Sequence, residues 1–118
     1  MKEVVAIIQM KKMEETKNAL DVVGVPAFTA YKVMGRGKQR GLDILYPSDL
    51  DEPRGGPVKF LPKRMITVVV EDEFVPAVVA VITKINRTGN IGDGRIFVIP
   101  IEESVRIRTG ERGSEAVS

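Results

Sequence analysis

The chain contains no cysteine and no histidine among its 118 residues. These two absences exclude disulfides, thiolate nucleophiles, cysteine–histidine zinc clusters and any Ser-His or Cys-His catalytic dyad. General acid–base chemistry would therefore have to use Asp, Glu, Lys or Tyr.

Long hydrophobic runs are absent too. No apolar run reaches the roughly 20 residues of a transmembrane helix, and Glu3 stands where a signal peptide would build its apolar region. We therefore expect a cytoplasmic protein without membrane insertion. The net charge is 18 − 16 = +2, too small to predict a nucleic-acid partner. Basic residues nevertheless concentrate in 32–40, 54–64 and 84–112, which leaves a local anion site open.

The apolar pattern predicts two similar halves within one domain of ordinary size. Gly24 is expected to cap the first helix, and Asp72 and Glu73 place negative charge at the start of the second. We expect a short extended segment over 104–109 and a flexible tail over 113–118. The predicted strands cover 3–9, 27–34, 64–71 and 95–101, and the predicted helices cover 12–23 and 75–87.

This βαβ, loop, βαβ order predicts an α+β, ferredoxin-like fold, with a four-stranded antiparallel sheet and both helices on one face. Segments such as 68–70 are apolar on both strand faces, so the uncovered face needs a partner. A homo-oligomer is the simplest one. The connection over 35–62 is rich in glycine and proline and has no periodicity. Long loops inside compact domains are usually functional or mobile.

The segment Gly35–Gly41 has the sequence GRGKQRG, with three cations and an amide in a glycine frame. Glycines let successive backbone N–H groups converge on an anion, and Lys or Arg adds charge. The alternative is a solvated basic turn. The pattern matches neither the Walker A sequence nor the dinucleotide-binding fingerprint.

A second glycine-rich turn lies between the predicted second helix and the last strand. Gly89, Gly92 and Gly94 fall within six residues, which exceeds the needs of a helix cap and indicates close backbone approach to a ligand. A purely structural turn is the alternative. Asp93 stands alone there, and such a residue hydrogen-bonds its own backbone more often than it ligates a metal.

Two further signals concern basic residues outside the glycine-rich segments. Arg106 and Arg108 lie on one face of the predicted extended segment, where two guanidiniums suit di- or triphosphate recognition, with a surface charge pair as the alternative. Lys63 stands at the base of the long loop, and its alternative is an ordinary exposed lysine. Together these segments describe a phosphate site, and no candidate nucleophile–base pair accompanies them.

The sequence strongly resembles the PII signal-transduction family over residues 1–112. The resemblance implies a trimer of ferredoxin-like subunits that binds ATP or ADP between subunits, and 2-oxoglutarate together with Mg-ATP. Residues 35–62 would form the effector loop. The matching blocks are MKEVVAII at 1–8, GRGKQRG at 35–41, FLPK at 60–63, TGNIGDGRIFV at 88–98 and VRIRTGE at 105–111.

The resemblance also implies roles for individual residues. Arg106 and Arg108 would clamp phosphates from the neighbouring subunit. Gln39 would meet the Mg²⁺ ion that accompanies the ATP phosphates. The remaining roles form three groups: Gly35, Gly37, Lys38, Gln39, Gly92, Gly94 and Arg95 at the phosphates; Ile7, Thr29 and Val69 at adenine and ribose; Gln39, Lys63, Arg40 and Gly41 at 2-oxoglutarate.

Departures from the common family pattern point to one branch. The family usually has GFGRQKG at 35–41, whereas this chain has Arg36 and Lys38, and it has Arg95 where Lys is usual. The loop is longer than usual, and Tyr46 aligns with a tyrosine that is not uridylylated, so we predict no uridylylation. These features resemble the nitrogen-fixation branch, whose members inhibit dinitrogenase, usually as a complex of two related chains. 2-Oxoglutarate with ATP relieves that inhibition.

The leading hypothesis is therefore a non-enzymatic regulator that senses ATP, ADP and 2-oxoglutarate and inhibits dinitrogenase through its loop. A second hypothesis keeps the regulator but changes the target to an ammonium transporter or a nitrogen-assimilation enzyme. A third is a small ATPase, for which the sequence offers no base to activate water and no clear pair of Mg²⁺ carboxylates. The fourth is a ferredoxin-like structural module without a ligand.

Overall fold

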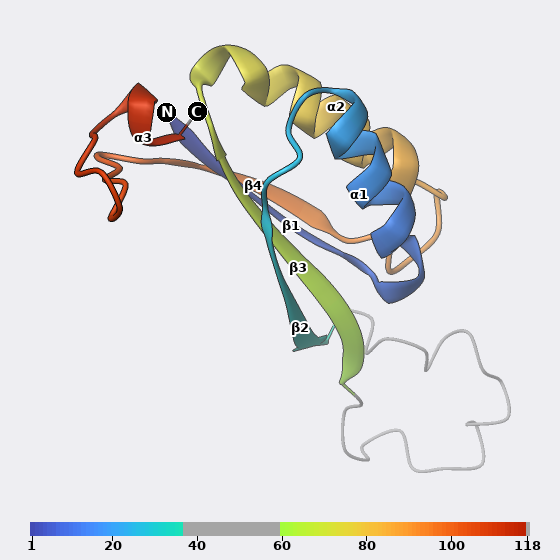
Figure 1. The fold of residues 1–118 in the computed structure, drawn as a ribbon. Coiled ribbons are helices and arrows are strands. Elements are labelled where there is room, and N and C mark those ends of the chain that lie inside the picture. The colour runs from blue at the N-terminus through green and yellow to red at the C-terminus, as the bar shows by residue number, and fades with distance from the viewer. Residues whose placement is uncertain (37–59, 118) are drawn as a thin grey trace, which may run out of the picture.

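The protein is described here by a computed structural model, which covers residues 1–36 and 60–117 (Figure 1). Short 3-10 turns, Met10–Lys12 and Asp72–Phe74, precede the two long helices. The elements follow the predicted order, with boundaries shifted by a few residues: β1 (Lys2–Gln9), α1 (Met13–Val22), β2 (Thr29–Gly35), β3 (Leu61–Val70), α2 (Val75–Asn86), β4 (Arg95–Pro100) and α3 (Ser114–Val117).

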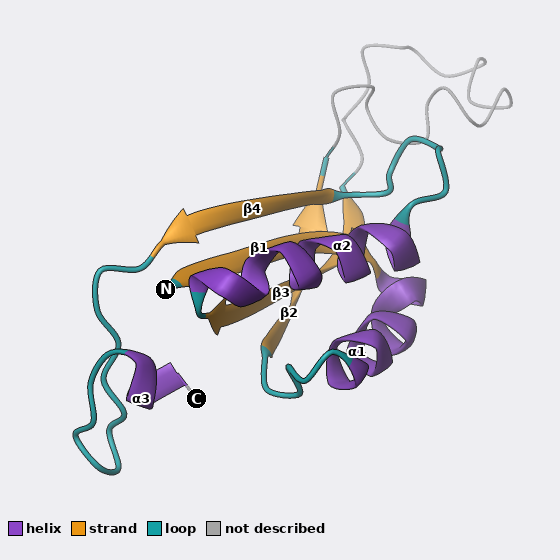
Figure 2. Cartoon of the chain, turned by 90° about the horizontal axis from the view of Figure 1, so that it is seen from above, coloured by secondary structure: helices purple, strands orange, loops and turns teal. Residues whose placement is uncertain are grey.

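The strands form one antiparallel sheet in the order β2-β3-β1-β4. Helices α1 and α2 lie side by side on one face of this sheet (Figure 2). The predicted ferredoxin-like, α+β fold is therefore confirmed. Strand β3 begins at Leu61 rather than at Arg64, because its ladder with β2 continues to the pair Gly35–Leu61.

The core lies between the sheet and the two helices, and the alternation of the strands decides its membership. Along β1 the buried positions are Val4, Ala6 and Ile8, each at most 2% exposed. Leu20 of α1 and Ile82 of α2 cover them and are equally buried. Burying side chains of this size stabilises a fold by about 1.5–3 kcal/mol each.

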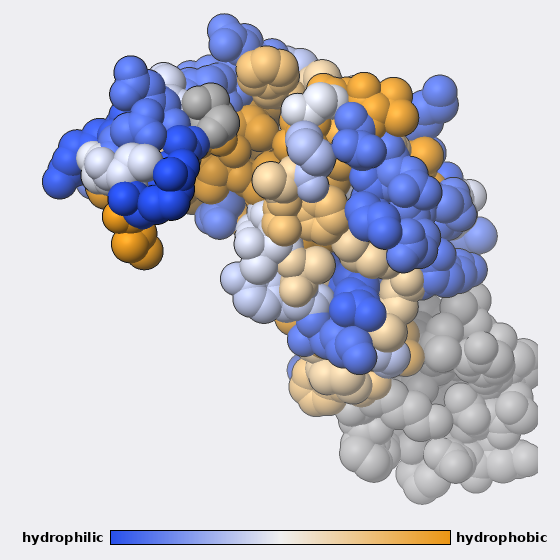
Figure 3. All heavy atoms as spheres, in the orientation of Figure 1, coloured by the Kyte–Doolittle hydropathy of each residue, from blue (hydrophilic) through white to orange (hydrophobic). Residues whose placement is uncertain are grey.

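No helix of the described residues lies over the opposite face of the sheet, as predicted. Val5 and Ile7 of β1 and Val69 of β3 lie on this open face and are only half-buried, while Phe97 of β4 is 46% exposed. In Figure 3, hydrophobic atoms are seen on the surface between the helices and the C-terminal segment. An apolar sheet face of this kind indicates a protein partner.

Helix α1 ends in a Schellman motif, which confirms Gly24 as its cap. Gly24 has φ +83°, and its N–H donates to the carbonyl of Asp21 at 3.0 Å. The N–H of Val25 donates to the carbonyl of Leu20 at 2.9 Å. The second helix ends differently: α2 stops at Asn86 and Arg87 is already extended, so Gly89 serves the following turn rather than the helix.

The C-terminal segment departs from the prediction. An extended segment over 104–109 is wrong beyond Arg106, because residues 107–109 form a turn in which the N–H of Gly110 donates to the carbonyl of Arg106 at 2.7 Å. Val105 pairs with Arg112 across this turn. Within the expected tail, Ser114–Val117 form the short helix α3. None of the helices in the described ranges has the length and apolar character needed to cross a membrane.

Gly94 offers a direct test of this packing. It has φ +111°, and a Cβ at this position would lie 1.9 Å from the carbonyl oxygen of Ile7. Since that contact is with backbone, Gly94→Ala should lower the free energy of unfolding by about 2 kcal/mol or more, measured by urea titration.

Gly89→Ala is the matched control for Gly94→Ala. Gly89 also has a positive φ, +83°, but nothing lies within 4 Å of its added Cβ. Gly89→Ala should lower the free energy of unfolding by only ~1 kcal/mol, which is the effect of the left-handed backbone conformation alone. Equal losses in the two variants would contradict the close approach of Gly94 to β1.

Candidate functional site

The ends of several strands meet where the segment after Arg36 leaves the sheet. Gly35 at the end of β2 pairs with Leu61 at the start of β3. The guanidinium of Arg36 lies 5.9 Å from the centroid of the Phe60 ring, within the range of a cation–π contact. The two ends of the predicted effector loop are therefore held beside each other. Gly37, Lys38, Gln39, Arg40 and Gly41 lie outside the described residues, as does Tyr46.

Lys63 connects this loop base to the second glycine turn. Its Nζ donates to the carbonyl oxygen of Gly92 at 2.8 Å, and Gln9 Nε2 donates to the same oxygen at 3.1 Å. A Cβ on Gly35 would lie 3.4 Å from Lys63 Cγ. Thus Gly35, Lys63 and Gly92, three of the predicted ligand-binding residues, are brought together in one chain.

The charge of Lys63 is incompletely compensated in this position. Desolvation by burial lowers the pKa of Lys63 from its ordinary value, and the nearby Asp93 opposes that shift. The hydrogen bond that its Nζ donates goes to a neutral carbonyl, that of Gly92. An anion arriving here would provide a stronger, charge-assisted partner. Lys63 is therefore more than an ordinary exposed lysine.

Asp93 organises the glycine turn from within. Its Oδ2 accepts from the backbone N–H groups of Thr88 at 2.7 Å and Gly89 at 2.9 Å, and its Oδ1 accepts from Thr88 Oγ1 at 2.5 Å. These hydrogen bonds, above all those from Thr88, lower the pKa of Asp93. The prediction that Asp93 bonds its own backbone is confirmed. Within the described ranges no group of three metal-ligating side chains was found.

The residues predicted to meet adenine and ribose all lie on the open face of the sheet, but not at one point. Ile7 pairs with Met65, Thr29 with Thr67, and Val69 with Glu3. Ile7 and Glu3 are four residues apart on one strand, or roughly 13 Å. One chain therefore cannot place Ile7 and Val69 against the same small ring.

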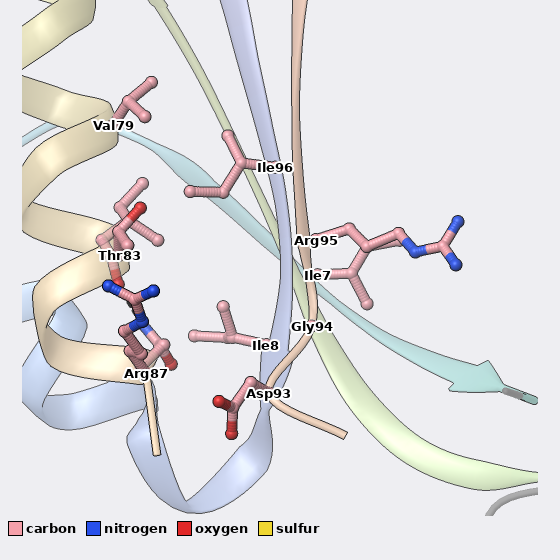
Figure 4. A pocket seen from close by; sticks show the side chains of 11 residues that line it. Ile7, Ile8, Val79, Thr83, Arg87, Asp93, Gly94, Arg95 and Ile96 are labelled. Atoms are coloured by element: carbon pink, nitrogen blue, oxygen red, sulfur yellow. Dashed lines mark hydrogen bonds between the residues drawn. The ribbon is translucent and has the colours of Figure 1, made fainter. Parts of the chain in front are cut away.

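Figure 4 shows which side of the sheet each residue faces near the glycine turn. Ile7 and Arg95 point away from α2, onto the open face, whereas Ile8 and Ile96 point toward the helix. Arg95 pairs with Ile7 at the start of β4. Gly92, Gly94 and Arg95 thus stand at the loop end of the open face, next to Lys63.

Arg106 and Arg108 lie elsewhere. They follow β4 at the end of the sheet opposite the loop base, as both ribbon views show (Figures 1 and 2). Arg106 Nη1 makes an ion pair with Glu111 at 3.0 Å, and Thr109 Oγ1 donates to the same carboxylate at 2.7 Å. Within one chain the arginine pair does not join the glycine turn at 88–95.

A cavity of about 310 Å³ opens on the helix side of the glycine turn. Ile8, Val79, Ile82 and Ile96 supply apolar walls, and Thr83, Arg87 and Asp93 supply polar groups (Figure 4). Sequence reasoning missed this cavity, because its walls follow the same periodicity as ordinary core. It also missed Gln9, although the strand alternation that places Ile7 on the open face places Gln9 there too.

Comparison with known proteins decides the family. The sequence profile described as "Nitrogen regulatory protein P-II" matches residues 1–111. This chain belongs to the PII family. The PII protein of Arabidopsis thaliana, in a crystal structure with bound citrate, has the same fold with a TM-score of 0.77 and 32% identity, over 99% of this chain and 89% of that one.

Relatives from methane-producing archaea place this PII chain in a branch associated with nitrogen fixation. "Nitrogen fixation nifHD region GlnB-like protein 2" of Methanothermobacter marburgensis is 50% identical, over 99% of this chain and 100% of its own length. "Nitrogen regulatory protein P-II 2" of Methanothermobacter thermautotrophicus is 48% identical, over 99% and 97% respectively. Both are named as regulatory or GlnB-like proteins, not as enzymes.

The carboxylate of Asp93 predicts a pH-dependent contribution to stability. Since its pKa is lower in the folded chain than in the unfolded one, its contribution is present above about pH 4 and is lost as the pH falls through the folded pKa. Asp93→Asn should therefore be less stable than the parent at pH 6, and the difference should shrink toward pH 3. Denaturant titrations across this range measure it.

Glu102→Gln is the control for Asp93→Asn, since Glu102 is exposed and makes no hydrogen bond or ion pair within the described residues. Its stability should follow that of the parent at every pH. A constant deficit of Asp93→Asn from pH 6 to pH 3 would contradict the role of the carboxylate charge.

Proposed function

We propose that this PII chain forms a homotrimer that binds ATP or ADP in clefts between its subunits, and 2-oxoglutarate together with Mg²⁺ and ATP. The observation that carries the proposal is the convergence of Gly35, Lys63 and Gly92 at the base of the loop. PII proteins are trimeric and bind ATP or ADP and 2-oxoglutarate. The convergence supplies a cation and two glycine backbones at one point, which suits a phosphate or a carboxylate.

The separation of the predicted residues supports a cleft shared by two subunits. Ile7 and Val69 are too far apart within one chain to contact one adenine ring. Arg106 and Arg108 lie at the far end of the sheet from Lys63. A neighbouring subunit would bring Val69 and Thr29, and also the arginine pair, to the glycine turns of the first. The apolar open face supplies the surface that such an assembly would bury.

Ligand binding would act on the loop through Lys63. Without an anion, this ammonium is hydrogen-bonded to Gly92 and stands two residues inside the start of β3. A phosphate or the carboxylate of 2-oxoglutarate would take over that hydrogen bond. Gln39, Lys38, Arg40 and Gly41, which the sequence assigns to the same ligands and to Mg²⁺, would approach from the other end of the loop. Differential binding of ATP, ADP and 2-oxoglutarate would then select loop conformations.

The target we propose is dinitrogenase, inhibited through the loop with or without a second, related PII chain. The nitrogen-fixation names of the relatives support this choice over an ammonium transporter or a nitrogen-assimilation enzyme. Affinity capture with the tagged trimer from nitrogen-fixing cells distinguishes these three candidate targets. Recovery of dinitrogenase subunits, released by 2-oxoglutarate with Mg-ATP, is the expected result, and recovery of a transporter alone would redirect the proposal.

The ligand assignment is tested by titrating 2-oxoglutarate calorimetrically, with and without Mg-ATP. The parent chain should bind 2-oxoglutarate only when Mg-ATP is present. Lys63→Met should weaken that binding by about tenfold or more, because a charge-assisted contact is lost.

Lys84→Met is the matched control, since Lys84 is an exposed lysine near the end of α2. It should bind 2-oxoglutarate as the parent does. Binding that needs no Mg-ATP, or equal affinities of the Lys63→Met and parent chains, would refute the assigned site.

A further inference from the structure

Two features of the chain have no place in the ligand site described above. One is Ile107, whose side chain is 98% exposed, the highest value among the exposed large hydrophobic residues of the described ranges. The other is the cavity on the helix side of the glycine turn. The first is an apolar side chain without a pocket, and the second is an apolar pocket without an occupant.

The turn that carries Ile107 is well fixed. The N–H of Arg106 donates to the carbonyl of Glu111 at 2.8 Å, and the N–H of Gly110 donates back to Arg106 at 2.7 Å. The ion pair of Arg106 with Glu111 and the bonds of Thr109 to the same residue add to these contacts. Ile107 is therefore held out in solvent on an ordered turn.

The cavity suits such a side chain. Its walls are formed mainly by aliphatic residues of β1, α2 and β4, namely Ile8, Val79, Ile82 and Ile96. The exposed Thr83 lies on the α2 side of it (Figure 4). At about 310 Å³ it has room for one branched aliphatic side chain.

One chain cannot bring these two features together. The turn of Ile107 follows the far end of β4, whereas the cavity lies at the start of β4, beside the end of α2 (Figures 1 and 2). The occupant must come from a second copy. We propose that Ile107 of each subunit inserts into the cavity between α2 and β4 of the next subunit. This inference rests on the shared cleft proposed above.

The cleft makes this docking geometrically consistent. Asp93, Gly94 and Arg95 line the cavity and belong to the glycine turn, whose other side faces the proposed phosphate site. Because Arg106 and Arg108 flank Ile107, an inserted Ile107 delivers both guanidiniums to the same turn. Each contact joins two different surfaces head to tail, which is the kind of contact that a cyclic trimer repeats between all its subunits.

Charge makes the docking depend on nucleotide. Asp93 attracts the incoming arginines, but the guanidinium of Arg87, which also lines the cavity, repels them. A bound phosphate between the cations removes that repulsion. Insertion of Ile107 should therefore be strengthened by ATP, and Ile107 anchors the turn that carries Arg106 and Arg108 rather than contacting the ligand.

The test uses the absence of native cysteine. In Ile107→Cys combined with Thr83→Cys, the introduced thiols are the only ones, and a short bismaleimide should link neighbouring subunits into covalent dimers and trimers on denaturing gels. ATP should increase the yield. The control pair, Ile107→Cys with Val22→Cys, places the second thiol at the 86% exposed end of α1 and should stay largely monomeric on the gel.

The outcomes separate this inference from the proposed function. Trimers in solution without cross-linking of the 107/83 pair, or with equal cross-linking of both pairs, would overturn the docking of Ile107 and leave the shared cleft standing. Monomers by light scattering would overturn the cleft itself. As a second readout, Ile107→Ala should weaken ATP binding by about tenfold, whereas Val22→Ala, at an exposed aliphatic residue of α1, should not.

Discussion

The strict alternation of side chains along β1 and β3 is the constraint on which the rest of the molecule depends. Because of it, Val4, Ala6 and Ile8 lie in the core beneath the helices, and Val5 and Ile7 lie on the face opposite α1 and α2. A shift of one residue in register would exchange the two faces. The apolar open face, the position of the ligand residues on it and the need for neighbouring subunits all follow from this alternation.

The glycine turn at 88–95 links this strand pattern to the ligand site, because it packs directly against β1. Gly94 lies so close to β1 that a Cβ would overlap the carbonyl of Ile7, and Asp93 fixes the preceding residues through Thr88 and Gly89. The turn thereby has two defined sides. One meets Lys63 at the loop base, and the other forms a wall of the cavity behind α2. A ligand on the first side and a neighbour on the second would act on the same few residues.

Much of the fold could be predicted from the sequence, because it depends on local periodicity. The alternation of strands, the helical spacing and the Gly24 cap specify the ferredoxin-like order without reference to distant contacts. The turn at 107–109 could not be predicted, since it is closed by contacts that the local pattern does not show, namely the ion pair of Arg106 with Glu111 and the bridge of Val105 with Arg112. The contact of Lys63 with Gly92 depends on strand register, which joins residues 29 positions apart.

The sequence alone also could not show that the predicted ligand residues divide into two groups. Gly35, Lys63, Gly92 and Arg95 gather at one end of the sheet, while Arg106 and Arg108 lie at the other. Family resemblance supplied the expectation of a neighbouring subunit, and the topology provides a physical reason for it. The distance between the groups is set by the length of β4, which no side-chain substitution changes.

Subunit mixing tests the shared site most directly. Lys63→Met removes the contribution of the subunit that supplies the glycine turn. Arg106→Ala with Arg108→Ala removes the contribution of the neighbouring subunit. Each variant alone should bind 2-oxoglutarate with Mg-ATP poorly. If every site combines two subunits, trimers reassembled from a mixture of both variants should regain a fraction of intact sites, and binding should reappear. Mixed trimers that bind no better than their parents would contradict a site shared between neighbours.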